Sequence, residues 1–321
     1  SDGILHCPIL LMQVTRLVCG GFIVGCRFNH TMSDGTGFVQ FMTAVAEIAR
    51  GASVPSVKPV WNRELLMARN PPRVICVPHV YDEYHHNYGL PVADMVYLED
   101  TIDLSFFFSL PEIASLKNLL PPHLRTCSKF EILATCIWRC RTIALNFNSS
   151  DIVRFVCVVN ARAKLNPPLP VGYYGNALGL PVALTTVGEL CQNPLGYALE
   201  LVKKAKDDVT DEFMKSTADF LVINGRPNYA NIRTYEVSDT THMGLKKTDF
   251  GWGKQVYSGP IDYNIGECYF QLSINKKGED GMFAMVSLPR PSMERFTVEI
   301  EKMIREANGV NFSYFPALSR L

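Results

Sequence analysis

The chain has 321 residues, which is more than one ordinary hydrophobic core holds, so two domains are expected. Hydrophobic residues make up 47% and charged residues 19%, a composition typical of globular rather than disordered proteins. Basic and acidic residues number 31 each, and this zero formal charge argues against nucleic acid as the main partner. No apolar run reaches transmembrane length, so no membrane partner is expected.

The ten cysteines lie mostly in apolar stretches, and none forms a Cys-x-x-Cys pair. We interpret them as small buried side chains in a protein of a reducing compartment. Cys136 and Cys140 lie one helical turn apart, but no histidine nearby completes a zinc site. His79, His85 and His86 are irregularly spaced, which favours a solvated loop over a metal site. The sequence therefore predicts no metal.

The first predicted elements are two strands, over residues 9–18 and 22–28, joined by Cys19-Gly20-Gly21. Glycine supplies the positive φ that a tight hairpin needs. Helical spacing of apolar residues follows over residues 38–49. His30 therefore lies in a polar loop between a buried strand and a helix, where a rigid scaffold can hold a reactive side chain.

Between residues 52 and 98 prolines recur and periodicity is lost, which predicts a long crossover between domains. Regular structure then resumes, and Ser128 with Glu131 forms a capping box. The mixture of hairpins and helical crossovers favours α/β domains with mixed sheets over a regular doubly wound sheet. The predicted elements are helices over 130–145, 194–223 and 293–307, and strands over 152–159, 177–184, 233–238, 268–274 and 282–288.

The first candidate for chemistry is the motif Asn29-His30-Thr31-Met32-Ser33-Asp34-Gly35. Histidine is the natural general base near neutral pH, and an alcohol is a poor nucleophile until its proton is removed during attack. Asp34 either orients the imidazole directly or holds the loop through an arginine. The alternative is a loop histidine hydrogen-bonded to backbone, because one chance His-x-x-x-Asp pattern is not surprising in a chain with seven histidines.

Two glycine-containing motifs are further candidates. In Asp249-Phe250-Gly251-Trp252-Gly253, glycines permit close backbone approach and tryptophan offers apolar area with one N–H donor. The alternative for this motif is a structural turn packed on a core. A proline-rich run leads into Gly172-Tyr173-Tyr174-Gly175-Asn176, which is not a dinucleotide fingerprint because no helix follows it. Arg162, just after a predicted strand, is a cation that a buried carboxylate can use.

Taken together and in this order, the motifs at 30–35, 172–176 and 249–253 resemble those of the BAHD family of plant acyl-CoA-dependent acyltransferases. The resemblance covers essentially the whole chain, including Leu5-His6-Cys7-Pro8 and Asn193-Pro194-Leu195-Gly196-Tyr197-Ala198. It is greatest to fruit and floral alcohol acyltransferases, including benzyl alcohol benzoyltransferases. It implies two chloramphenicol-acetyltransferase-like α/β domains with mixed sheets, and a channel that acyl-CoA and the alcohol enter from opposite faces.

The resemblance also assigns roles to residues. His30 would be the general base, and Asp249 and Asp34 complete the candidate catalytic set. Asp34 would point away from the substrate and pair with Arg162, a structural support. Asn160 departs from the aspartate of many relatives, which affects details of that loop. The substrate and CoA channel and the stabilisation of the oxyanion would involve Trp252, Gly251, Gly253, Asn176 and Ser238, with Trp252 as candidate donor.

The resemblance implies three parts. Residues 1–55 would be the C-terminal portion of a first domain that carries the His30 motif. Because the chain opens with Ser1 and runs directly into a strand, we expect the N-terminal part of that domain to be missing. Residues 56–98 would be a crossover linker, and residues 99–321 a second domain that carries the Asp249–Gly253 motif.

The expected reaction transfers an acyl group from acyl-CoA to the hydroxyl of a small alcohol, giving an ester and free CoA without a cofactor. The alternatives are an amine N-acyltransferase, a non-catalytic acyl-CoA-binding protein and an inactive fragment. We expect a cytoplasmic monomer. A peroxisomal location is the alternative, because Ser319-Arg320-Leu321 differs by one residue from Ser-Lys-Leu. The sequence names neither the acyl donor nor the alcohol, since apolar pockets discriminate weakly.

Overall fold

The computed structural model describes residues 7–81, 100–225, 233–245, 248–253, 255–259, 267–275 and 277–309. His85, His86 and the C-terminal tripeptide lie outside these residues, as does the part of the predicted 56–98 crossover after residue 81. The chain divides into two compact units. The first contains residues 1–67, 160–178 and 243–258, and the second contains the remainder. Two segments that the sequence analysis assigned to the second domain thus pack with the first unit, and the boundaries at 55 and 99 stay predictions.

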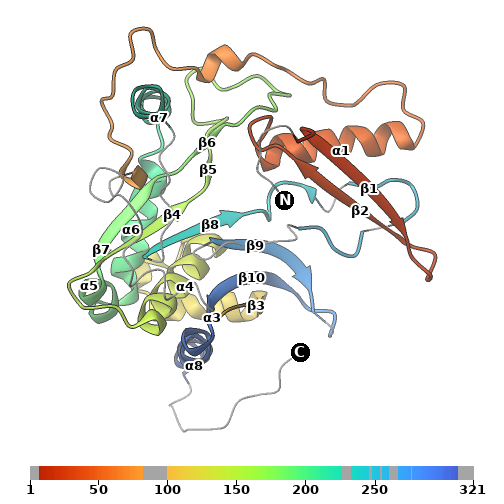
Figure 1. Cartoon of the computed structure of the whole chain (residues 1–321). Helices are drawn as coiled ribbons and strands as arrows, with labels where there is room; N and C mark the ends of the chain where they lie inside the picture. The colour runs from red at the N-terminus through yellow and green to blue at the C-terminus, as the bar shows by residue number, and fades with distance from the viewer. Residues whose placement is uncertain are drawn as a thin grey trace. The chain divides into compact units, whose positions relative to one another are not determined.

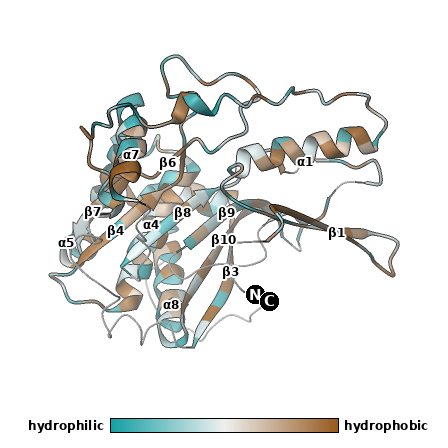
Figure 2. Ribbon diagram, turned by 45° about the horizontal axis from the view of Figure 1, so that its top comes forward, coloured by the Kyte–Doolittle hydropathy of each residue, from teal (hydrophilic) through white to brown (hydrophobic). Residues whose placement is uncertain are grey.

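The first unit begins with the predicted hairpin and helix. Strands β1 (Leu10–Arg16) and β2 (Phe22–Phe28) pair antiparallel, and Gly20 in the turn has φ +87°. Helix α1 (Gly35–Ala49) follows. It begins three residues earlier than predicted, because the side chain of Asp34 accepts a hydrogen bond from the amide of Gly37 and caps the helix. The hairpin carries much of the hydrophobic colouring of this unit (Figure 2), and Val14 and Ile23 are exposed.

Two later segments complete the first unit. The chain before the 3₁₀ helix η1 (Arg63–Leu66) runs beside residues 171–174, where Val60 and Tyr173 form an isolated parallel bridge. Gly172 is required at this crossing: its φ is +92°, and a Cβ there would lie 2.1 Å from the carbonyl oxygen of Lys58. The short strands β5 (Val159–Asn160) and β6 (Leu178–Gly179) pair with each other where segment 160–178 leaves and rejoins the second unit.

The second unit is built on a six-stranded mixed sheet (Figure 1). Strands β9–β8–β4 are parallel neighbours, whereas the pairs β3–β10, β10–β9 and β4–β7 are antiparallel. This confirms the predicted mixed-sheet α/β class. The strands in spatial order are β3 (Thr101–Ser109), β10 (Asp280–Pro289), β9 (Glu267–Ile274), β8 (Thr234–Asp239), β4 (Ile152–Cys157) and β7 (Val182–Thr186).

Helices cover both faces of this sheet. Alternate residues of β4 point to opposite faces: Phe155 enters the main core beside Trp138, and Val156 packs with Phe220 in a second, smaller core. The smaller core belongs to α7 (Asp211–Asn224). The main core is formed with α3 (Leu110–Leu116), α4 (Lys129–Leu145), α5 (Val187–Gln192), α6 (Leu195–Asp207) and α8 (Arg290–Ala307), and the 3₁₀ turns η3 (Lys117–Leu119) and η4 (Pro122–Leu124) follow α3.

Several boundaries differ from the predictions. The helix predicted over 194–223 is two helices, because Thr210 caps a new helix at Asp211. The strand predicted over 177–184 is divided between β6 and β7, with Pro181 between them. The last helix begins at Arg290 rather than Met293. Strand β3 and helix α3 were not predicted, whereas the capping box of Ser128 and Glu131 is present.

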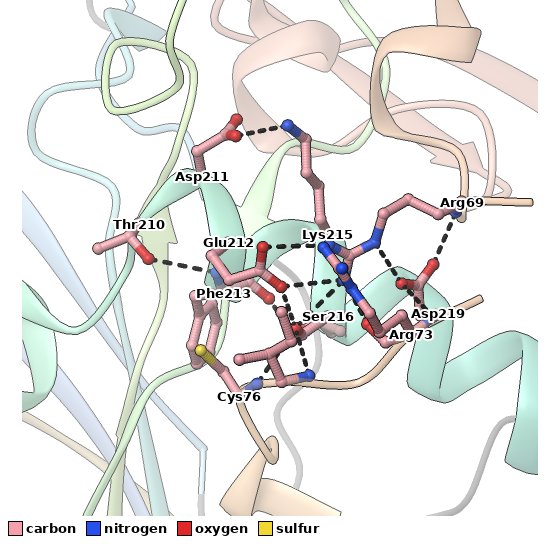
Figure 3. Close-up of polar contacts among 12 residues, drawn as sticks. Arg69, Arg73, Cys76, Thr210, Asp211, Glu212, Phe213, Lys215, Ser216 and Asp219 are labelled. Atoms are coloured by element: carbon pink, nitrogen blue, oxygen red, sulfur yellow. Dashed lines mark hydrogen bonds and ion pairs between the residues drawn. The ribbon is translucent and has the colours of Figure 1, made fainter. Parts of the chain in front are cut away.

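A cluster of charged side chains fastens the start of the crossover segment to α7 within the second unit (Figure 3). The Arg69 guanidinium donates to both carboxylate oxygens of Glu212, at 2.9 and 3.0 Å, and its Nε donates to Asp219 at 2.6 Å. The backbone amides of Arg69 and Arg73 donate to the same Asp219 carboxylate at 2.6 and 2.8 Å. Asp219 is fully buried, so this carboxylate exchanges its hydration for charged and amide donors.

Ser216 extends this cluster, accepting hydrogen bonds from the amides of Ile75 and Cys76 at 3.1 and 3.2 Å. Burial raises the pKa of Asp219, but the hydrogen bonds outweigh burial and the pKa is lowered from its ordinary value. Hydrogen bonding from the guanidinium is the largest cause that lowers the pKa of Glu212. The segment after residue 67, which the sequence predicts only as an irregular crossover, is thus held by α7.

Among the described residues, no helix is long and apolar enough to cross a membrane. The described part of the chain also contains no group of three or more His, Cys, Asp or Glu side chains that could hold a metal ion.

Candidate functional site

His30 lies in a turn between β2 and α1, and its side chain is exposed. The turn is closed by a hydrogen bond of 3.0 Å from the amide of Met32 to the carbonyl of Asn29. The Asn29 side chain accepts from the amide and hydroxyl of Thr31, at 3.0 and 2.7 Å. The imidazole stacks on Phe28, with ring centroids 6.0 Å apart. The turn therefore presents the imidazole to solvent from a backbone that local side chains already order.

Asp34, four residues after His30, is completely buried. One carboxylate oxygen accepts from the amide of Gly37 at 3.0 Å and from Arg162 at 2.9 Å. The other oxygen accepts from the amide of Ala177 at 3.0 Å and from Arg162 at 2.8 Å. Four donors thus surround the carboxylate, and two of them form the bidentate pair that arginine makes with carboxylates. The structure contains the expected ion pair with Arg162, and both Asp34 oxygens are used in holding the loop.

All five N–H donors of the Arg162 guanidinium form hydrogen bonds. Besides its two bonds to Asp34, it donates to the carbonyls of Tyr173 and Gly175, at 3.1 and 2.7 Å, and to the side chain of Asn160 at 3.3 Å. A planar fork with fixed donor directions suits such a site, and a lysine could not replace it. Arg162 therefore connects the helix cap after His30 to segment 160–178.

Asn176 contacts the His30 turn directly. Its Nδ2 donates to the carbonyl of His30 at 2.7 Å. Asn160 also reaches the helix start, donating to the Thr36 hydroxyl at 3.3 Å. The structure thus brings together His30, Asp34, Arg162 and Asn176 from segments more than 100 residues apart.

Arg63 was not identified from the sequence, although it contacts the same turn. Its guanidinium donates to the carbonyl of Thr31 at 3.2 Å and also to the carbonyl of Met32. The guanidinium lies over the Trp61 ring, 4.2 Å from the centroid, and 5.7 Å from the ring centroid of Tyr174. Arg63 lies in the aperiodic crossover, where the local sequence offers little to indicate its role. The one signal is Trp61, an aromatic residue two positions before the arginine, which suggests a cation–π contact.

The Asp249–Gly253 motif also belongs to the first unit, but it lies at the other end of β2 and α1. Phe22, the first residue of β2, packs edge-on against Phe250 and Trp252, with centroids 6.1 and 5.8 Å apart. Arg50, at the end of α1, donates to the carbonyl of Asp249. Both elements are about 20 Å long, at roughly 1.5 Å per helical and 3.3 Å per strand residue.

The motif therefore does not join His30 in this geometry. The Trp252 side chain is 73% exposed and contacts the hairpin rather than the His30 turn. Asp249 accepts a hydrogen bond from the amide of Gly251 at 2.8 Å, and Gly251 and Gly253 both have positive φ. These contacts favour a structural role for the motif. The fifth predicted channel residue, Ser238, lies in β8 of the second unit.

The titration of Tyr173 follows from its position beside Arg162. Burial raises the pKa of this phenol, and the nearby guanidinium groups of Arg63 and Arg162 only partly offset it. The phenol therefore stays protonated near neutral pH. Because the side chain is buried and its ring lies 5.9 Å from the guanidinium of Arg162, we interpret it as packing for that arginine rather than as an acid or base.

Comparison with known proteins identifies the family. A family model described as the Transferase family matches residues 2–303. Benzyl alcohol O-benzoyltransferases of Petunia hybrida and Nicotiana tabacum are each 53% identical over 310 residues, covering 95% of this chain and 66% of each relative. Alcohol acyl transferase 1 allele GSa of Malus domestica is 46% identical, covering 95% of this chain and 67% of that relative. The chain thus spans just under two thirds of the length of the first two relatives.

Solved structures give the same fold. Vinorine synthase has a TM-score of 0.67 and 18% identity, covering 92% of this chain and 66% of that chain. F. graminearum TRI101 complexed with ethyl coenzyme A has a TM-score of 0.65 and 20% identity, covering 92% of this chain and 69% of that chain. With the family match over nearly the whole length, the chain belongs to the BAHD transferase family.

Proposed function

We propose that this protein transfers an acyl group from acyl-CoA to the hydroxyl of a small alcohol, with His30 as the general base. The proposal rests on an exposed imidazole in a rigid turn. Asp34, four residues after His30, is buried and accepts hydrogen bonds from four donors, which fixes the chain directly after the turn. Rigid placement of one exposed base is what general-base catalysis requires. The names of the relatives, which are alcohol acyltransferases, supply the substrate classes.

In the proposed reaction, Nε2 of His30 accepts the hydroxyl proton as the alcohol oxygen attacks the thioester carbonyl carbon. The carbonyl becomes a tetrahedral oxyanion, and its collapse breaks the carbon–sulfur bond. The departing CoA thiolate takes the proton from the imidazolium, which returns His30 to its starting state. Thiolates leave readily because the conjugate thiols have a pKa of about 8.5, by analogy with cysteine. Proton transfer by one positioned base is sufficient for these steps, so the proposal includes no cofactor.

Asp34 and Arg162 act in this proposal as positioning residues rather than as acids or bases. Both oxygens of Asp34 are occupied, so its carboxylate orients the turn and the start of α1. Asn176 adds a direct restraint on the carbonyl of His30. The Asp249–Gly253 motif supports the far end of the hairpin. The monomeric state, the cytoplasmic location, and roles in the channel for Ser238 and Trp252 stay predictions.

The test is CoA release from acetyl-CoA and benzoyl-CoA, with benzyl alcohol or hexanol as acceptor. Alcohol-dependent release is expected, and His30→Ala should lower it by about a hundred- to ten-thousand-fold. Because His30 is exposed, the variant should fold normally, and circular dichroism and thermal melting check this. CoA release with amines but not with alcohols would show that the protein forms amides rather than esters. A folded protein that binds CoA but is inactive with both acceptors would assign a binding role.

A further inference from the structure

Three consecutive carbonyls of the His30 turn accept hydrogen bonds from outside the turn. The His30 carbonyl accepts from Asn176, and those of Thr31 and Met32 accept from Arg63. One donor group comes from segment 160–178 and the other is Arg63, the first residue of η1. Restraint of successive peptide planes fixes the backbone from which the His30 side chain projects. An exposed turn of this kind would otherwise sample several conformations.

Arg63 is itself held in position. Its guanidinium stacks on Trp61, and the Trp61 and Tyr174 ring centroids are 5.6 Å apart. Gly175 lies close to this guanidinium, because a Cβ there would lie 2.9 Å from the hydroxyl of Tyr173 and 3.2 Å from Nε of Arg63. The preceding chain is fixed by a hydrogen bond of 2.9 Å from the amide of Val60 to the carbonyl of Gly172.

These contacts close a ring. Asp34 binds Arg162, which binds the carbonyls of Tyr173 and Gly175. Tyr174, between them, lies under the guanidinium of Arg63, which returns to the carbonyls directly after His30. The end of the turn and the helix cap that follows it are therefore restrained by arginines from different segments, and removal of either one opens the ring.

We propose that Arg63 is a positioning residue for the acyl-transfer reaction, acting through the Thr31 and Met32 carbonyls to hold the His30 imidazole in its reactive orientation. The inference rests on the proposed function of His30. Arg63 is distinct from the Asp34–Arg162 pair because it binds the turn itself rather than the helix cap. A guanidinium suits this place, since two parallel donors bind neighbouring carbonyls while the flat face stacks on an aromatic ring.

The test is Arg63→Met, which keeps a long apolar side chain against Trp61 but removes every donor. We expect kcat to fall by about 10- to 100-fold, because a small displacement of a catalytic group costs that much, with both KM values nearly unchanged. Arg63→Lys should fall between Arg63→Met and the parent, since an ammonium keeps the charge but not the planar fork. Arg16→Met, on an exposed arginine at the far end of the hairpin, is the matched control.

A double variant separates positioning from general disruption. If Arg63 acts through His30, Arg63→Met should not lower the residual rate of His30→Ala further. Equal losses in both backgrounds, or an unchanged kcat in the single variant, would overturn the inference. If Arg63→Met does not fold, Arg63→Lys carries the same comparison.

Imidazole NMR signals of His30, assigned by their loss in His30→Ala, report the turn without catalysis. Arg63→Met should broaden or split them, and Arg16→Met should leave them sharp. Unchanged signals would overturn the inference. If Arg63→Met broadens these signals but the parent protein forms no ester, the structural contact is retained and the proposed function is refuted instead.

Discussion

The two compact units each contain an arginine bound to a completely buried aspartate, and the pairs are built alike. Asp34 and Asp219 both accept guanidinium and backbone amide hydrogen bonds, and both lie on or at the start of a helix. Each pair joins segments well over 100 residues apart. In both cases a distant arginine binds a carboxylate that a helix holds in place.

The difference lies in what each pair holds. Asp34 caps α1 four residues after an exposed histidine, so the pair holds the loop that carries that imidazole. Asp219 sits inside α7 and holds a crossover segment that contains no proposed reactive group. A buried ion pair is therefore not by itself a sign of an active site. What the pair restrains decides whether its loss affects chemistry or stability alone.

The largest difference between the two pairs is expected from the matched substitutions Asp34→Asn and Asp219→Asn. Each is nearly isosteric and replaces a carboxylate oxygen by a donor that faces an arginine. Asp34→Asn should cost on the order of 3 kcal/mol of stability and lower kcat by about 100-fold in protein that remains folded. Asp219→Asn should lower Tm but leave kcat per folded molecule near the parent value.

Thermal melting and steady-state kinetics on the same samples, below the lower Tm, make this comparison. Arg162→Met disrupts the Asp34–Arg162 pair from its other side and should lower kcat as much as Asp34→Asn does. A kinetic loss as large in Asp219→Asn as in Asp34→Asn would contradict the proposed difference between the two pairs.

A smaller effect is expected at the far end of the hairpin, where Trp252→Phe tests whether the Asp249–Gly253 motif belongs with the His30 site. Phenylalanine keeps an aromatic edge for Phe22 but removes the indole N–H. A structural motif predicts a change in kcat of about two-fold or less, because Trp252 is mostly exposed. A direct oxyanion donor would instead cost about 100- to 1,000-fold in kcat.

Local patterns predicted much of the fold. The β1–β2 hairpin, the capping box of α4 and the mixed α/β class all follow from spacing and turn chemistry over a few residues. The early start of α1 was predictable in principle, because Asp34 precedes a Gly-Thr-Gly run and is a preferred N-cap residue. Thr210 before Asp211-Glu212 similarly marks the helix break that the continuous prediction missed.

Contacts across long sequence separations were harder to predict. The pairing of Asp34 with Arg162 was expected from the family resemblance, whereas Arg63 and Arg69 lie in an aperiodic, proline-rich segment whose local pattern does not indicate their distant partners. Their roles depend on carbonyls and carboxylates that only the folded chain brings near. The motif at 249–253 shows the converse, because its glycines and tryptophan suggest a site while its contacts are with a strand end and a helix end.

The smallest expected effect is in the pH dependence of stability, and it concerns the second pair alone. The pKa of Asp219 is lowered from an ordinary value of 3.8, and that of Glu212 from 4.5. A carboxyl group whose pKa is lower when folded stabilises the protein above its unfolded pKa, and this stabilisation is lost as pH falls through the folded pKa. The parent Tm should therefore decline steeply below about pH 4.5.

Asp219→Asn should have a lower Tm than the parent at pH 7, and its Tm should decline less below pH 4. Asp211→Asn, which removes an exposed i,i+4 pair with Lys215, should change Tm little at any pH. Melting curves between pH 7 and pH 3 measure this, and parallel declines for parent and Asp219→Asn would show that the second pair does not contribute to acid unfolding.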